Sequence, residues 1–172
     1  KPLVQNIDET AAIAEMAHAA GISCEGEIGF VGYSGREDSN GTDPGEAAKF
    51  ASDSGVDAMA ISVGNVHLQQ NKEGGLDLAR ISEIEAMTSI PLVIHGGSGV
   101  PVAQRTLLAK QTSICKFNIG TELRLAFGAA LRLAVASDPD RFDRVQILVD
   151  TINPVQIAAQ RILSAFGAPA QR

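Results

Sequence analysis

Two histidines and one glutamate in this chain have the types and the positions of metal ligands. Glu27, His67 and His95 each stand at or just after the end of a short segment that we expect to be a strand. Neighbouring parallel strands lie about 4.8 Å apart, so side chains at matching heights on them can converge on one ion. Two neutral imidazoles with a carboxylate suit zinc, and a catalytic zinc keeps a position open for substrate. One histidine alone would more simply be a core residue; the set of three favours a zinc site.

The segment after His95 consists mainly of glycine. The glycine-rich turn at residues 96–99 has amides that can approach an anion closely, with one hydroxyl among them. After the next expected strand, residues 120–121 open a helix, and helix N-termini attract anions. Either turn alone could be an ordinary connection, but together they favour a phosphate site. Its candidate residues are Gly96, Gly97, Ser98, Gly120 and Thr121.

A long polar connection, residues 29–44, follows Glu27. Connections of this length in compact domains are often lids. Glu37 and Asp38 could bring a carboxylate over the metal as an acid or a base. The alternative is that both are solvated loop charges.

Helices and strands alternate along the chain. The periodicity predicts strands over residues 22–32, 57–64, 91–97 and 113–121. It predicts helices over residues 6–20, 43–55, 76–89, 101–112 and 122–137, and two closing helices over residues 140–152 and 154–167. Asp43 is the expected N-cap of the second helix, and Thr121 caps the fifth.

Strands that are apolar on both faces, each followed by a helix, predict an α/β fold with a parallel sheet. Polar residues at the carboxyl ends of several strands are typical of a (β/α)8 TIM barrel. A closed barrel takes eight strands and about 250 residues. We therefore expect this 172-residue chain to be a single domain, roughly the second half of such a barrel plus C-terminal helices, with N-terminal strands missing.

The composition favours small-molecule chemistry. A net charge of −6 and 4 % aromatic residues argue against a nucleic-acid surface, and no apolar run has the length of a membrane span. Cys24 and Cys115 lie in apolar segments, which predicts buried free thiols in a reducing compartment. We expect a cytoplasmic protein.

Four motifs together resemble the class II, metal-dependent ketose-bisphosphate aldolases, which act on fructose and tagatose bisphosphates. They are EGEIG with the acidic loop after it, TDPGEAAKFASDSGVDAMAISVGNVH, PLVIHGGSGVP and KFNIGTELR, in the family's order and spacing. The resemblance covers nearly all of the chain and implies a (β/α)8 barrel. It implies that zinc polarises the carbonyl of dihydroxyacetone phosphate, so that an enediolate forms and adds to an aldehyde without a Schiff-base lysine. A second divalent ion or a monovalent cation is left open.

The resemblance also implies roles for particular residues. His67 and His95 match the family's second and third zinc-binding histidines, and Glu27 matches the glutamate of its ELG motif, a ligand of an alternative or second metal position. Asn118 matches the asparagine that contacts the enediolate. Glu37 or Asp38 falls where the family's mobile loop places its acid/base carboxylate.

The phosphate-binding groups of the family match Gly96, Ser98 and Thr121. Two departures accompany these matches. Leu68 stands where the family usually has a glycine that serves the phosphate and a monovalent cation, which leaves the substrate open. Nothing in the chain corresponds to the first zinc histidine and the aspartate beside it.

The expected function is zinc-dependent aldol cleavage or condensation of a ketose bisphosphate in carbohydrate metabolism such as glycolysis, by a homo-oligomer, dimer or tetramer. The alternatives are an aldolase-family enzyme for another phosphorylated ketose and a metal-free barrel that binds a phosphosugar without chemistry. A mechanism through a Schiff-base lysine would need a lysine close to the other site residues. Lys116 is the candidate that lies in an expected strand, and strand alternation places it on the same face as Asn118.

Overall fold

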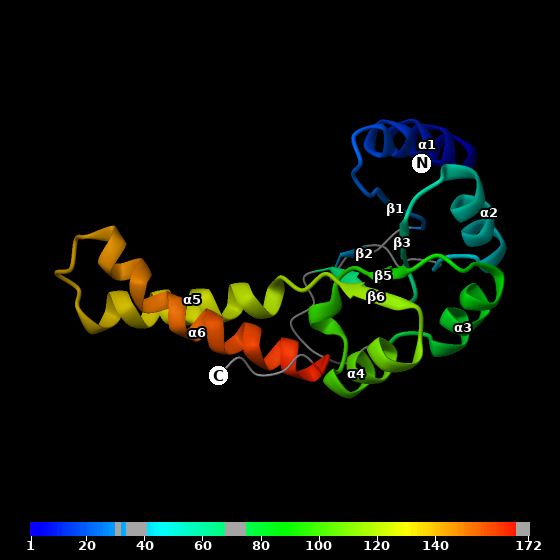
Figure 1. Cartoon of the computed structure of the whole chain (residues 1–172). Coiled ribbons are helices and arrows are strands. Elements are labelled where there is room, and N and C mark those ends of the chain that lie inside the picture. Colours follow the sequence, from blue (N-terminus) through cyan, green and yellow to red (C-terminus); the bar gives the residue numbers. More distant parts are fainter. Residues whose placement is uncertain (30–31, 34–40, 68–74, 168–172) are drawn as a thin grey trace. The chain divides into compact units, whose positions relative to one another are not determined.

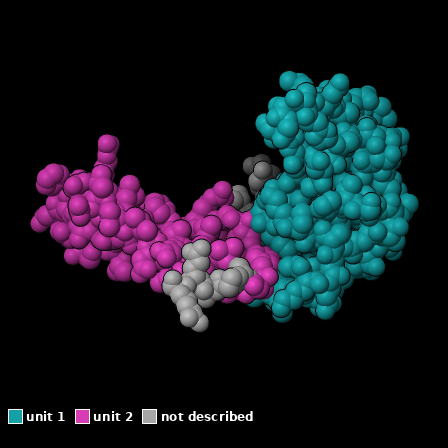
Figure 2. Space-filling view, viewed as in Figure 1, with its two compact units in different colours: residues 1–118 teal, residues 119–172 magenta. Residues whose placement is uncertain are grey.

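The structure, a computed structural model, describes residues 1–29, 32–33, 41–67 and 75–167. The chain forms two compact units, Lys1–Asn118 and Ile119–Arg172, which Figure 2 shows in different colours. We still expect both units to belong to one domain, and that stays a prediction.

The first unit contains a parallel sheet of four strands. Its order is β1 (Glu25–Glu27), β3 (Ala58–Ile61), β5 (Leu92–Ile94) and β6 (Ile114–Phe117). A helix precedes or follows each strand: α1 (Leu3–Ala19), α2 (Pro44–Ser54), α3 (Leu78–Met87) and α4 (Val102–Gln111) (Figure 1). A 3-10 turn, η1 (Gly97–Gly99), lies between β5 and α4. The α/β fold with a parallel sheet is therefore confirmed.

A second sheet consists of one very short parallel pair of strands. β2 (Gly32–Tyr33) pairs with β4 (Val66–His67), with Tyr33 opposite His67. The sequence predicted a loop in place of β2. Gly32 and Tyr33 therefore lie beside the segment that carries His67.

Local sequence signals account for the starts of two helices. The side chain of Asp43 accepts a hydrogen bond from the amide of Glu46 at 2.9 Å, and Pro44 occupies the first turn of α2. The side chain of Asp77 does the same for the amide of Arg80 at the start of α3. Asp43 is thus confirmed as an N-cap.

One face of the sheet packs against the helices. Gly26, Met59, Leu92 and Ile114 form a row across the four strands on this face. A Cβ on Gly26 would lie 2.8 Å from the ring of Phe50, so glycine allows α2 to lie close to β1. Met59, Leu92 and Ile114 are buried with the helix residues in one core.

The opposite face carries the polar side chains. Its central row is Glu27, Ala60, Val93 and Lys116. Ala58 and Ala60 of β3 lie opposite Glu25 and Glu27 of β1. Small side chains on β3 therefore leave space over this face next to the two glutamates.

The second unit is a pair of helices, α5 (Thr121–Ser137) and α6 (Arg144–Ala165), packed together. The expected break between two closing helices is wrong, because α6 continues through Pro154. A proline inside a helix costs about 3 kcal/mol, and packing of α6 along α5 offsets this cost. The expected cap at Thr121 is also wrong: Gly120 is the N-cap, and no side chain caps α5.

Both cysteines are free, but only Cys24 is buried. Cys115 is exposed because it lies on β6, an outer strand, at the point where the pairing with β5 shifts by one residue. In the described part of the chain, no helix has the length and apolar character needed to cross a bilayer.

Candidate active site

A buried asparagine fixes the backbone of His95. His95 directly follows β5, and its carbonyl accepts a hydrogen bond from Asn65 Nδ2 at 3.0 Å. Asn65 also donates to the carbonyl of Ile61 and accepts from the amide of Val63. Only 2 % of Asn65 is exposed. The ends of β3 and β5 are therefore joined at the position of the candidate metal ligand.

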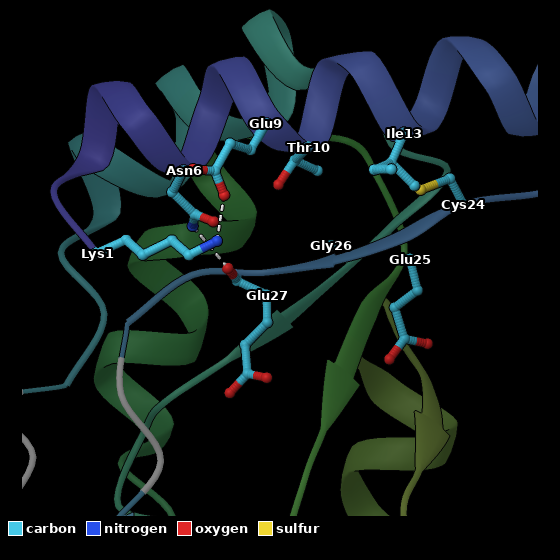
Figure 3. A pocket seen from close by; sticks show the side chains of 9 residues that line it. All are labelled: Lys1, Asn6, Glu9, Thr10, Ile13, Cys24, Glu25, Gly26 and Glu27. Carbon is cyan, nitrogen blue, oxygen red and sulfur yellow. Dashed lines mark hydrogen bonds and ion pairs between the residues drawn. The ribbon is translucent and has the colours of Figure 1, made fainter.

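The imidazole of His95 lies between two carboxylates of β1. Nε2 is 3.2 Å from Glu25 Oε1, and Nδ1 is 3.5 Å from Glu27 Oε2. The His95 side chain is only 16 % exposed. Figure 3 shows that the side chains of Glu25 and Glu27 both point away from α1. Glu27 and His95, predicted from the sequence to share a site, are thus brought together.

Lys116 also reaches this cluster. Its Nζ donates to Glu25 Oε2 at 2.6 Å. Partial burial raises the pKa of Glu25, but the hydrogen bonds from Lys116 and His95 outweigh burial and hold this pKa below its usual value. Glu25 is therefore an ionised carboxylate with both oxygens engaged.

A groove between α1 and β1 lies beside these glutamates (Figure 3). Within it Asn6 Nδ2 donates to the backbone carbonyl of Glu27 at 2.9 Å, and Lys1 pairs with Glu9. The bond from Asn6 ties α1 to the strand that carries Glu27. It thereby helps to fix the carboxyl end of β1.

The glycine-rich turn is held to the end of β6. The amide of Gly97 donates to the carbonyl of Asn118 at 3.0 Å, and the amide of Asn118 donates to the carbonyl of Ile94. Gly96 has a φ of +64°, which favours glycine, and Ser98 is buried. Because its amide already has an acceptor, Gly97 shapes the turn, and Gly96 and Ser98 are the better candidates for contact with an anion.

Several predicted site residues are not placed in this cluster. The backbone of His67 lies in β4, but Glu37, Asp38 and Leu68 lie outside the described residues. Gly120 and Thr121 belong to the second unit, at the start of α5. That these two residues form one phosphate site with the glycine-rich turn stays a prediction.

Two of the candidate metal ligands, Glu27 and His95, lie close together. Among the described residues, no group of three His, Cys, Asp or Glu side chains is arranged to hold a metal ion. Two ligands at about 2.0–2.1 Å from a tetrahedral zinc lie about 3.3–3.4 Å apart. The 3.5 Å between His95 Nδ1 and Glu27 Oε2 is close to that separation. These two side chains therefore fit as neighbouring ligands of one metal.

Sequence reasoning missed the place of two residues in this cluster. Glu25 was given no role, although strand alternation puts it on the same face as Glu27. Lys116 was considered only as a rival nucleophile. The only local signal for Lys116 was strand alternation, which places it on the same face as Asn118.

The sequence profile of the family described as "Fructose-bisphosphate aldolase class-II" matches residues 1–171. The chain belongs to this family. It is 36 % identical over 180 residues to a fructose-bisphosphate aldolase of Geobacillus stearothermophilus, covering 99 % of this chain and 61 % of the relative. It is 34 % identical over 172 residues to a 6-phospho-5-dehydro-2-deoxy-D-gluconate aldolase of Shouchella clausii, covering 97 % of this chain and 58 % of the relative.

Solved structures of aldolases share the fold of this family member. The YdjI aldolase from Escherichia coli K12 matches with a TM-score of 0.76 at 28 % identity, covering 99 % of this chain and 59 % of that one. A fructose-bisphosphate aldolase from Campylobacter jejuni matches with a TM-score of 0.72 at 20 % identity, covering 99 % and 57 %. The chain thus has the fold of part of a TIM barrel. It spans about three fifths of the length of these relatives.

Proposed function

We propose that the full-length protein catalyses metal-dependent aldol cleavage and condensation of a ketose bisphosphate, giving dihydroxyacetone phosphate and an aldehyde. The observation that carries this proposal is the placement of the His95 ring against Glu27 at the carboxyl end of a parallel sheet. Membership in the class II aldolase family supports it. Fructose-1,6-bisphosphate and tagatose-1,6-bisphosphate are the substrates to test first.

His95, Glu27 and His67 are the residues that would hold zinc. When bound, zinc supplies Lewis-acid polarisation of a substrate carbonyl. A second divalent ion or a monovalent cation is left open. The residues themselves contribute a partly enclosed position, because the His95 side chain is mostly buried and its backbone is anchored by Asn65.

The remaining candidate residues are proposed to have the roles that the sequence predicts for them. Gly96 and Ser98 would bind the substrate phosphate together with Gly120 and Thr121. Asn118 would contact the reacting part of the substrate, and its backbone bonds to Ile94 and Gly97 give it a fixed place beside the glycine-rich turn. Glu37 or Asp38 would transfer a proton as the acid/base group.

A Schiff-base route is disfavoured by the contact between Lys116 and Glu25. Attack on a carbonyl needs a free electron pair on the lysine nitrogen. The Nζ of Lys116 instead donates to a carboxylate at 2.6 Å. A nitrogen engaged in this contact is not presented to a carbonyl, so we propose that Lys116 forms no covalent intermediate.

A second candidate is aldol chemistry on another phosphorylated ketose. One relative, at 34 % identity, is named for 6-phospho-5-dehydro-2-deoxy-D-gluconate. Leu68 also replaces the glycine that the family usually has after the histidine aligned with His67. A non-catalytic phosphosugar-binding barrel is the remaining alternative, and metal analysis separates it from an enzyme because such a binder would hold no stoichiometric zinc.

We also propose a cytoplasmic homo-oligomer, dimer or tetramer. Large apolar side chains are exposed on and between α5 and α6, with Leu133 at 71 % and Phe142 at 96 % exposed. Exposed apolar surface of this kind is typical of subunit interfaces. Sedimentation of the full-length protein tests the oligomeric state.

The experiment for the proposed function is a cleavage assay of the full-length protein. Fructose-1,6-bisphosphate, tagatose-1,6-bisphosphate and 6-phospho-5-dehydro-2-deoxy-D-gluconate are compared, each with and without a chelator. The proposal expects chelator-sensitive cleavage of one of the two bisphosphates. Preference for the third compound favours the second candidate, and cleavage of none contradicts the proposal.

A further inference from the structure

The two ring nitrogens of His95 face the two carboxylates of β1 at different distances. The 3.2 Å between Nε2 and Glu25 Oε1 is within the range of an N–H···O hydrogen bond. The 3.5 Å between Nδ1 and Glu27 Oε2 is beyond that range and close to the separation of two ligands on one zinc. The Nε2 side of the ring is therefore hydrogen-bonded to Glu25, and the Nδ1 side faces Glu27.

Glu25 is itself held in place. Lys116 Nζ donates to Oε2, while the other oxygen, Oε1, faces His95. Charge-assisted hydrogen bonds are stronger than neutral ones, and solvent screens this one in part because the Lys116 side chain is 49 % exposed. Rotation of the carboxylate away from His95 would break this bond, so Lys116 fixes the orientation of Glu25.

The sheet makes room for this arrangement. β3 lies between β1 and β5, and its residues opposite Glu25 and Glu27 are Ala58 and Ala60. Alanine side chains are small and take up little space between β1 and His95. The glutamates can therefore reach over β3 without displacing a larger side chain.

We propose that Glu25, held by Lys116, is a positioning residue that accepts the Nε2–H of His95 and so directs Nδ1 toward Glu27 and the metal. This inference rests on the metal-dependent function proposed above. It adds two residues outside the proposed set of metal ligands.

The physical basis is the single N–H of a neutral imidazole. The partner of one ring nitrogen decides which nitrogen carries the proton and which keeps its electron pair for a metal. With Glu25 as acceptor on the Nε2 side, Nδ1 keeps its electron pair and the ring plane is set. Without Glu25, both tautomers and other ring orientations become accessible, and binding of the metal must restrict them.

The test uses the full-length protein with Glu25→Gln and Lys116→Met. Zinc affinity is measured by competition with a chelator, and we expect each variant to bind zinc about 10–100-fold more weakly, as is typical for loss of a group that orients a ligand. Lys116→Arg keeps the cation and should restore affinity to near the original value. Thermal unfolding of each variant shows whether it is folded.

A second readout is the tautomer of His95 in the metal-free protein. Protein labelled with 15N-histidine is examined by NMR at pH 8.5, above the ordinary histidine pKa of about 6.5, and His95→Gln identifies the signal. We expect the proton on Nε2 in the original protein. In Glu25→Gln and Lys116→Met we expect a mixture of tautomers.

Two matched controls remove similar contacts elsewhere. Asp57→Asn removes the carboxylate that lies 2.9 Å from His18 Nε2, and Lys49→Met removes the ion pair with Asp53 in α2. Both should bind zinc as tightly as the original protein. They separate loss of the His95 contact from a general effect of charge removal.

Unchanged zinc affinity in Glu25→Gln and Lys116→Met, or a proton on Nδ1 in the original protein, would overturn the positioning role. Complete loss of zinc from Glu25→Gln without a change of tautomer would make Glu25 a ligand and overturn it as well. A full-length protein that binds no zinc contradicts the proposed function instead. In that case the tautomer still decides whether Glu25 orients His95.

Discussion

Lys116 Nζ and Glu25 Oε2 lie 2.6 Å apart although β6 and β1 are the two outer strands of the four-stranded sheet. In a flat sheet these strands would be about 14 Å apart, and side chains would stand nearly perpendicular to the sheet. The contact therefore requires the sheet to curl over the face that carries Glu25, Glu27 and His95. This curl agrees with the TIM-barrel fold of the related structures.

Asn65→Ala should lower stability because it removes three hydrogen bonds at once, to Ile61, Val63 and His95. Buried backbone groups left without partners cost about 1–3 kcal/mol, so we expect a loss of about 2–3 kcal/mol in the free energy of unfolding. Urea unfolding of the full-length protein measures it. Asn6→Ala, which removes one bond to Glu27, is the control and should cost about 1 kcal/mol or less. Equal losses would contradict the anchoring role of Asn65.

Gly26→Ala should destabilise the protein because the added Cβ would lie 2.8 Å from the Phe50 ring and 3.0 Å from Val56. Overpacking of this kind costs about 1–3 kcal/mol. The matched control is Gly128→Ala in α5, where the new Cβ would meet only the flexible end of Arg132. Alanine is the better helix former, so the control should be neutral or slightly stabilising. Thermal unfolding compares the two, and a Gly26→Ala protein as stable as the control would mean that α2 does not pack closely on β1.

Local sequence signals predicted much of the first unit. Asp43 was predicted as an N-cap because the cap depends only on residues a few positions away. Contacts between distant residues were harder: Glu25 lies 70 positions from His95 and 91 from Lys116, and their meeting depends on the curl of the sheet. The sequence alone indicates the face of each residue, but not which side chains touch.

Two other differences between the predicted and the observed structure also arise from contacts with distant residues. α6 continues through Pro154 because packing along α5 outweighs the local penalty of proline. The pair of β2 and β4 was missed because each strand has only two residues and β2 lies in a glycine-rich connection. Such short strands depend on their partner and leave no periodic pattern.

Asp57 should give a specific acid dependence of stability. A hydrogen bond from the Cys24 amide and another from His18 lower the pKa of Asp57 below 3.8 in the folded protein. The unfolded chain therefore binds more protons in that range, and stability rises with pH. The contribution of Asp57 is present above pH 3.8 and is lost as pH falls through the lowered pKa. Urea unfolding from about pH 6 to pH 3 should show Asp57→Asn less stable than the original protein at the upper end, with the difference shrinking toward the lower end. A difference in stability that does not change with pH would contradict this role of Asp57.

Ser98→Ala should weaken binding of a phosphorylated substrate more than binding of its unphosphorylated analogue. The reason is that Ser98 is buried within the glycine-rich turn proposed to hold the phosphate. Loss of one hydrogen bond to a charged group corresponds to about 1.5–3 kcal/mol, or about 10-fold or more in affinity. Calorimetric titration compares the two ligands, with Ser137→Ala in α5 as the control. Equal losses for both ligands would remove the phosphate role.

The central claim is that carbon–carbon cleavage depends on a metal held by His95 and its neighbours and not on a lysine. Its most direct measurement is the cleavage rate of the full-length protein after chelation and after zinc is added back, with borohydride added in the presence of substrate. We predict that chelation abolishes cleavage, that zinc restores it, and that borohydride traps no covalent adduct. Cleavage that survives the chelator, together with a trapped adduct on Lys116, would contradict the account.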